Sequence, residues 1–129
     1  MPWDNGSIGF SDEEFTQIGK IGEKYDFSHN VDATIFLFSL GFRALDGRLN
    51  LPDVRIGKKR TRYNVGTLDS HDSVLLRVVE VIKQDMPDSS TNEIFECLAI
   101  SGAAWLSRQI DEHGHFGIAD ILTSPTFES

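Results

Sequence analysis

The sequence predicts an all-α fold, a small single helical domain of about four helices plus a short C-terminal helix. An extended basic excursion is expected between helices two and three. Three observations support this: the 129 residues allow one hydrophobic core, apolar residues recur at helical spacing in four stretches, and glycine and proline gather between the second and third of them. We expect a flexible N-terminal arm over residues 1–10, the domain over 11–123 and a tail over 124–129.

The first helix is expected over about residues 12–25. Ser11 and Glu14 have the spacing of a capping box, in which hydroxyl and carboxylate each accept a backbone N–H at the start of a helix. Apolar residues follow at helical spacing from Phe15 to Tyr25.

The second helix is expected over about 33–45, with Asp32 as its cap. Apolar residues cover every face of this stretch, which is typical of a central helix. Ser39 and Gly41 leave room for another helix to approach closely. Short extended strips are expected afterwards, at 53–56 and 62–65.

A third helix is expected over about 73–85, opened by Ser70 or Asp72. Apolar residues lie on one face of this helix, and the stretch 85–91 is expected to end it.

The fourth helix is expected to begin at a cap provided by Thr91 or Asn92 and to run to about 112, with Gly114 or Gly117 as its stop. Small side chains at 101–104 make the middle of this helix narrow, so that another helix can pack closely against it. The predicted core contains four residues of the two most apolar helices, buried against each other: Phe36, Leu40, Leu98 and Trp105.

Charge is distributed unevenly along this acidic chain. The formal net charge is −8, yet residues 43–62 hold seven basic and two acidic side chains, a net of +5, so the remainder carries −13. The basic segment, residues 55–62, contains five of these cations: Arg55, Lys58, Lys59, Arg60 and Arg62. Together with Tyr63 they are the candidate contact residues for phosphates or for an acidic partner surface. A solvated loop that balances an acidic body is the alternative interpretation.

Other motifs predict no chemistry. Gly19 and Gly22 match the Gly-x-x-Gly spacing of a nucleic-acid clamp, but they lie inside a capped helical pattern. Four potential metal ligands cluster at the end of the fourth helix, which favours histidine for dipole reasons: Asp111, Glu112, His113 and His115. We therefore expect no catalytic residue, no cofactor and no metal. The single cysteine, Cys97, and the lack of an apolar stretch of about 18 residues favour a cytoplasmic protein with no membrane span.

Two stretches resemble a known family. "DATIFLFSLGFRALDGR" (32–48) is similar to a "D-V-hydrophobic-F-A-A-x-L-G-[FY]-x-x-G-R" segment, and "FECLAISGAAWLSRQIDEHGHFGIADIL" (95–122) is similar to the ending of the same proteins. They are the Dnd-system-associated proteins of the fourth family, encoded beside bacterial DNA phosphorothioation and restriction genes. The chain departs from the family where Leu37 and Phe38 replace two alanines, and where "GAAWL" replaces its Gly-Asp-Leu site.

The resemblance implies a non-catalytic accessory or adaptor subunit of a bacterial DNA-modification or anti-phage defence system. Its partner would be a larger protein of that assembly, with or without the DNA backbone. The alternative is a small DNA-binding regulator that uses residues 55–62. A homo-oligomer is left open.

Overall fold

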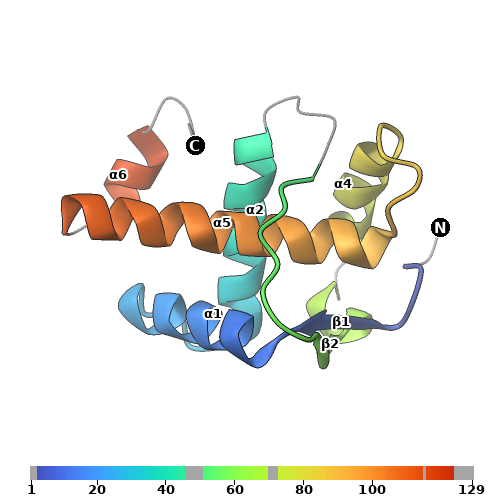
Figure 1. The fold of residues 1–129 in the computed structure, drawn as a ribbon, viewed down its shortest axis with the longest axis horizontal. Coiled ribbons are helices and arrows are strands. Elements are labelled where there is room, and N and C mark those ends of the chain that lie inside the picture. Colours follow the sequence, from blue (N-terminus) through green and yellow to red (C-terminus); the bar gives the residue numbers. More distant parts are fainter. Residues whose placement is uncertain (1–2, 46–50, 70–72, 115, 124–129) are drawn as a thin grey trace.

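The computed structural model describes residues 3–45, 51–69, 73–114 and 116–123, which form six helices and two strands (Figure 1). The long helix α5 (Thr91–His113) crosses α2 (Asn30–Leu45) at a steep angle. Helix α1 (Asp12–Lys24) lies on one side of α5, and α4 (Val74–Lys83) and α6 (Ile118–Thr123) lie on the other, while α2 extends to both sides. The fold is thus arranged around one crossed pair of helices.

Two glycines allow α2 and α5 to pack backbone against backbone. A Cβ on Gly41 would lie 1.8 Å from the carbonyl oxygen of Leu98, and one on Gly102 would lie 2.0 Å from the carbonyl oxygen of Leu37. No larger residue fits either place without separating the helices. The close approach predicted from Gly41 and from the small residues at 101–104 is therefore confirmed, whereas Ser39 is exposed.

The predicted core is confirmed for three of its four residues. Leu40, Leu98 and Trp105 are buried, and the Trp105 ring packs edge-on against Phe116. Phe36 is only half-buried and lies against the rings of Tyr25 and Phe27 instead.

The purely all-α prediction is wrong, although the fold is mostly helical. Strands β1 (Ser7–Phe10) and β2 (Arg60–Asn64) form a two-stranded antiparallel sheet. The expected excursion also contains the short helix α3 (Val65–Leu68). Strands this short carry almost no periodic signal, and their pairing depends on a partner fifty or more residues away.

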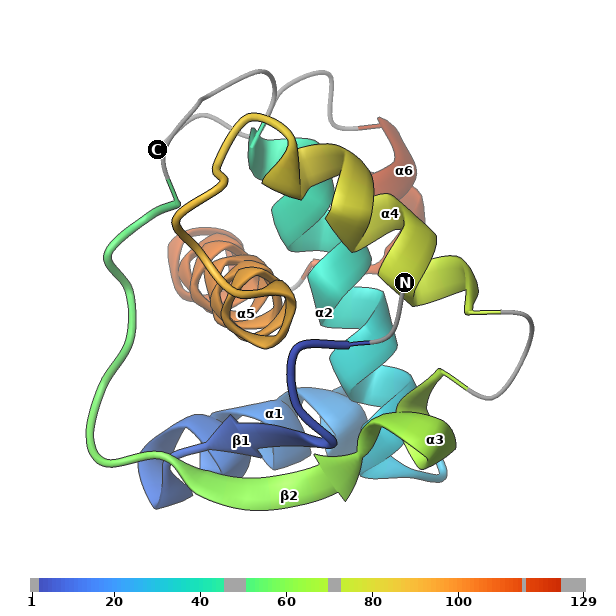
Figure 2. The same ribbon diagram turned by 90° about the vertical axis from the view of Figure 1, so that its right-hand side faces the viewer.

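Residues 3–10 of the N-terminal arm, which was expected to be flexible, pack against the rest of the protein, and residues 1 and 2 lie outside the described residues. Within β1, Ile8 and Phe10 are fully buried, because the strand lies between β2 and α5 (Figure 2). Trp3 packs edge-on against Phe95, and its indole N–H donates to Asp69 at 3.3 Å. The tail at 124–129 lies outside the described residues.

Helix starts agree with the predictions only in part. The capping box of Ser11 and Glu14 at α1 is confirmed. Helix α2 begins at Asn30, so Asp32 lies in its first turn and is not its cap. Of the caps expected for α4, Ser70 and Asp72 lie outside the described residues, and the carboxylate of Asp69 accepts the N–H groups of Leu75 and Leu76.

Helix α5 begins one residue earlier than predicted and ends as predicted. Its cap is Ser90, whose hydroxyl accepts the N–H of Glu93 at 3.1 Å. It ends at Gly114, whose φ of 72° favours glycine and whose N–H donates to Ile110.

Within the described residues, no helix is both long enough and apolar enough to cross a membrane.

Candidate functional site

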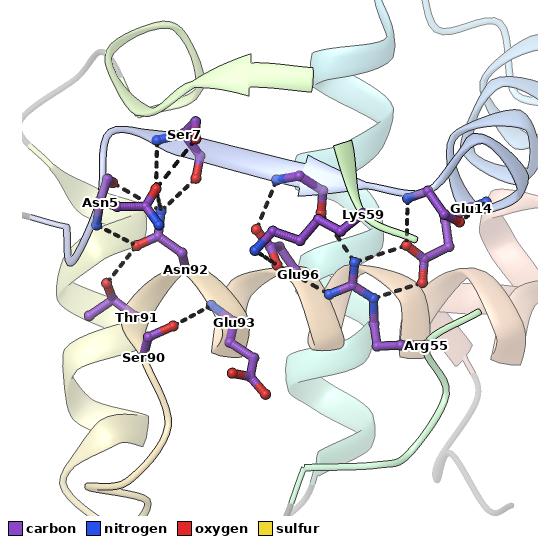
Figure 3. A network of polar contacts seen from close by, with 12 residues as sticks. Asn5, Ser7, Glu14, Arg55, Lys59, Ser90, Thr91, Asn92, Glu93 and Glu96 are labelled. Carbon is purple, nitrogen blue, oxygen red and sulfur yellow. Dashed lines mark hydrogen bonds and ion pairs between the residues drawn. The ribbon is translucent and has the colours of Figure 1, made fainter. Parts of the chain in front are cut away.

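The basic segment crosses α5 and then enters the sheet. From residue 51 the chain runs in extended form across α5 and reaches β2 beside the start of α1 (Figures 1 and 2). Its cations therefore lie next to two acidic residues of the helices, Glu14 of α1 and Glu96 of α5 (Figure 3).

Arg55 forms a two-pronged ion pair with Glu14. Its Nε lies 2.7 Å from Oε2 and its Nη2 lies 2.9 Å from Oε1. The same Glu14 oxygens also accept the N–H groups of Ser11 and Ile56, at 2.9 and 3.1 Å. The carboxylate that caps α1 therefore also holds the basic segment against the helix.

Glu96 is fully buried, and its charge is matched by the same segment. Arg55 Nη1 and Lys59 Nζ lie 3.1 and 2.9 Å from its Oε1. The N–H of Gly9 in β1 donates to its Oε2 at 2.8 Å. A buried carboxylate without such partners would be strongly destabilising. Glu96 thus joins α5, β1 and the basic segment at one point (Figure 3).

The pKa shifts agree with this geometry. Burial by itself would raise the pKa of Glu14, but the Arg55 guanidinium and the N–H groups of Ser11 and Ile56 outweigh it and hold that pKa below its ordinary value. Burial would lower the pKa of Arg55, and its contacts with Glu14 and Glu96 raise it instead. Both groups are charged at neutral pH.

Glycine at position 9 lets the segment lie directly on β1. A Cβ there would come within 2.7 Å of Lys59 Cγ and 2.9 Å of the carbonyl oxygen of Arg60. Gly57, with a φ of +81°, forms the turn that brings the segment past Ser11.

A β-bulge orients the next cation. Ile8 pairs with Tyr63 and Gly9 with Thr61, so Arg62 is an extra residue in β2. Its guanidinium carbon lies 4.6 Å from the centre of the Phe15 ring, and its Nη2 pairs with Asp12. Like Arg55 and Lys59, Arg62 is therefore engaged by the protein itself.

Tyr63 also contacts the interior rather than the surface. It is half-buried, its hydroxyl lies 3.0 Å from that of Thr34, and its ring contacts those of Phe10 and Phe15. Burial raises its pKa. It anchors β2 to the helices.

Three of the six predicted contact residues are exposed: Lys58, Lys59 and Arg60. The side chain of Lys59 is 48% exposed, although its Nζ pairs with Glu96. The side chain of Arg60 is 70% exposed, and its only ion pair in the described part of the chain is a distant one, 3.9 Å from Asp12. The sequence predicted the same role for all five cations of the segment. In the described structure, three of them pair closely with carboxylates of the protein, and two do not.

Sequence reasoning also missed a second network, which fixes the N-terminal chain to α5. Asp4 and Thr91 exchange two hydrogen bonds of 2.8 Å. The amide of Asn92 donates to the carbonyl oxygens of Asn5 and Ser7, and its oxygen accepts the N–H of Asn5 (Figure 3). Thr91 and Asn92, predicted as helix caps, therefore position β1 for its contact with Glu96.

A groove of about 390 Å³ between α1 and α5 adjoins the segment. Glu13, Lys20 and Asp111 line it, together with Glu14. Because the Glu14 carboxylate accepts four hydrogen bonds, it offers no free lone pair well suited to proton transfer.

The other candidate residues are not assembled into a site in the described part of the chain. No group of three or more histidine, cysteine, aspartate or glutamate side chains is placed there to hold a metal ion. His113 stacks on Phe116, and His115 lies outside the described residues. Cys97 is buried, which raises the pKa of its thiol although the Arg55 charge partly offsets this.

Comparison with protein families, with curated proteins and with solved structures finds no match for this chain. The resemblance to the Dnd-associated family stays a prediction.

Proposed function

We propose that the protein is a non-catalytic docking subunit that binds an acidic segment of a larger partner protein through Lys58 and Arg60. The observation that carries this proposal is that the cations of the basic segment differ in whether a carboxylate of the protein pairs closely with them. Arg55 and Lys59 contact buried Glu96, while Lys58 and Arg60 face solvent from the same short stretch.

The internal contacts prepare the exposed cations for binding. Arg55, Lys59 and Arg62 fix the backbone on both sides of Lys58 and Arg60. A partner that binds here does not have to order this backbone, which removes one cost of association. Charge complementarity at such a surface sets orientation and association rate more than affinity.

Direct binding to duplex DNA is the alternative function, and the geometry favours it less. Two exposed cations give a logarithmic salt slope of about 1.8, at about 0.9 for each phosphate contact. Exposed Asp12 lies 3.9 Å from Arg60, exposed Glu13 lies beside Gly57, and exposed Asp53 is five residues before Lys58. A wide duplex would bring further phosphates near these acidic groups. A single extended acidic peptide carries fewer charges to be repelled.

The cellular setting is also a proposal. The similarity of 32–48 and 95–122 to Dnd-associated proteins supports a partner in a bacterial DNA-modification or anti-phage assembly. Nothing in this similarity assigns a residue to that partner.

The test is capture of a partner from the native host, followed by reconstitution with the purified partner. Lys58→Ser with Arg60→Ser should reduce its affinity at least about tenfold. The matched control, Lys20→Ser with Arg108→Ser, removes two exposed cations elsewhere and should bind as the wild type does. Lys59 and Arg62 are left unchanged because their loss would disturb the fold.

Two results would contradict the proposal. The first is equal affinity of the wild type and the Lys58 and Arg60 variant for the partner. The second is nanomolar binding of the isolated protein to a defined DNA duplex at physiological salt, which would establish the regulator function instead.

A further inference from the structure

We propose that the outer edge of β2 binds its acidic partner by strand addition, so that a segment of the partner becomes the third strand of the sheet. This inference rests on the proposed function and names the form of the ligand: an extended peptide with carboxylates at alternate positions.

One edge of β2 is open in the described structure. The sheet has the order β1–β2, and β1 lies between β2 and α5, so β2 is at the margin of the molecule (Figure 2). Apart from its ladder with β1, no backbone group of residues 60–64 has a backbone partner among the described residues. In an antiparallel strand alternate residues direct N–H and C=O outward, which is a template for another strand.

The side chains beside this edge favour an acidic strand. Arg60 is the first residue of β2, and Lys58 lies two residues before the strand, a separation of about 6.6 Å in an extended chain. Carboxylates at positions i and i+2 of an added strand have the same spacing. Lys58 and Arg60 can therefore be matched one to one, while backbone hydrogen bonds supply affinity.

A second copy of this chain is a poorer occupant. Two β2 edges paired with each other would bring Arg60, Arg62 and their copies together. Like charges opposite one another on paired strands are destabilising. Cations on an edge strand are one way in which proteins prevent such self-association.

The edge is also held in place for binding. The Tyr63 ring packs against Phe10 and Phe15, and the bulge directs Arg62 to Phe15 and Asp12. Both contacts hold β2 against neighbouring parts of the protein, chiefly α1.

The experiment uses a fluorescent synthetic heptapeptide of alternating glutamate and threonine, titrated with the full chain at low and physiological salt. Two further peptides carry N-methyl groups on the odd or on the even amides. N-methylation removes backbone donors and leaves the charge unchanged. We expect one of these two peptides to bind at least tenfold more weakly than the parent, and the other to bind much as the parent does.

Protein variants separate the backbone contribution from the charge contribution. Lys58→Glu with Arg60→Glu should also weaken binding at least tenfold, whereas Lys20→Glu with Arg108→Glu, the matched change elsewhere, should not. Amide exchange should slow at alternate residues of 60–64 when the parent peptide binds.

Equal binding of all three peptides, with loss in the Lys58 and Arg60 variant, would overturn strand addition and support the proposed function. No binding of the parent peptide at about 1 mM would also overturn strand addition. The proposed function would then be judged by capture of the native partner.

Discussion

Arg55 and Arg60 belong to the same basic segment, yet their surroundings differ completely. Arg55 is 22% exposed and contacts two buried carboxylates, whereas Arg60 is 70% exposed and has only a distant contact with Asp12. One cation holds the fold together, and the other is available to a ligand. A cluster of like charges in a sequence can thus be two structural classes interleaved residue by residue.

This difference arises from contacts that are remote in sequence. Glu14 precedes Arg55 by 41 residues and Glu96 follows it by 41. Arg55 and Lys59 of the basic segment pair with the carboxylates of Glu14 and Glu96. Part of the charge asymmetry along the chain is therefore neutralised inside the molecule. The solvated-loop interpretation therefore fails for Arg55, whereas Lys59 combines an exposed side chain with an ion pair to Glu96.

The largest expected effect separates these two arginines. Arg55→Met should lower the free energy of unfolding by about 3–5 kcal/mol, because Glu14 and Glu96 lose a buried partner. Arg60→Met should change it by less than about 0.5 kcal/mol. Urea denaturation followed by circular dichroism measures both.

A double-mutant cycle checks the cause. Arg55→Met combined with Glu14→Gln should be less destabilised than the sum of the single variants, with a coupling of about 1–3 kcal/mol. A loss below about 1 kcal/mol in Arg55→Met would show that this contact does not hold the segment in place.

The second prediction concerns pH. Because the folded-state pKa of Glu14 lies below its ordinary value of 4.5, its contribution is present above that value and is lost as the pH falls through the folded-state pKa. One carboxyl group adds at most about 1.4 kcal/mol per pH unit to this slope. Urea titrations between pH 7 and pH 3 should show a shallower slope for Glu14→Gln.

The control for this prediction is Glu13→Gln, which makes the same change of residue type at the exposed neighbour, outside the contact with Arg55. Equal slopes for the wild type and Glu14→Gln would mean that Arg55 does not favour the charged form of Glu14.

The smallest expected effect distinguishes two adjacent lysines. Lys59→Met should cost about 1 kcal/mol, since buried Glu96 loses one of its two cations but keeps Arg55 and the N–H of Gly9. Lys58→Met should cost less than about 0.5 kcal/mol. Thermal unfolding of the two variants, measured side by side, gives the difference in stability. Equal losses of stability would show that the pair between Lys59 and Glu96 does not contribute to the fold.

Local features were predictable from the sequence. Ser11 and Glu14 lie three residues apart, and their reciprocal hydrogen bonds depend only on helix geometry. Gly41 and the small residues around Gly102 lie on strongly apolar helices, so close packing of α2 and α5 followed from their size. The helix ending at Gly114 followed from glycine's tolerance of positive φ.

The sheet and the candidate site were not predictable in the same way. Strand β1 pairs with β2 and is held against α5, a helix near the other end of the chain. Glu96 accepts the N–H of Gly9, and the Asn92 amide donates to the carbonyl oxygens of Asn5 and Ser7. The dual role of Glu14, as cap and as partner of Arg55, has no local signal.

The contact between Gly9 and Glu96 spans 87 residues, which has a consequence for biosynthesis. At about 5–20 residues per second, a ribosome makes Glu96 roughly 4–17 s after Gly9. During that interval Ile8 and Phe10, fully buried in the finished fold, have no α5 to cover them. The nascent chain therefore emerges with an exposed apolar strand, and its final docking is a late step that chaperones able to bind apolar segments would have time to guard.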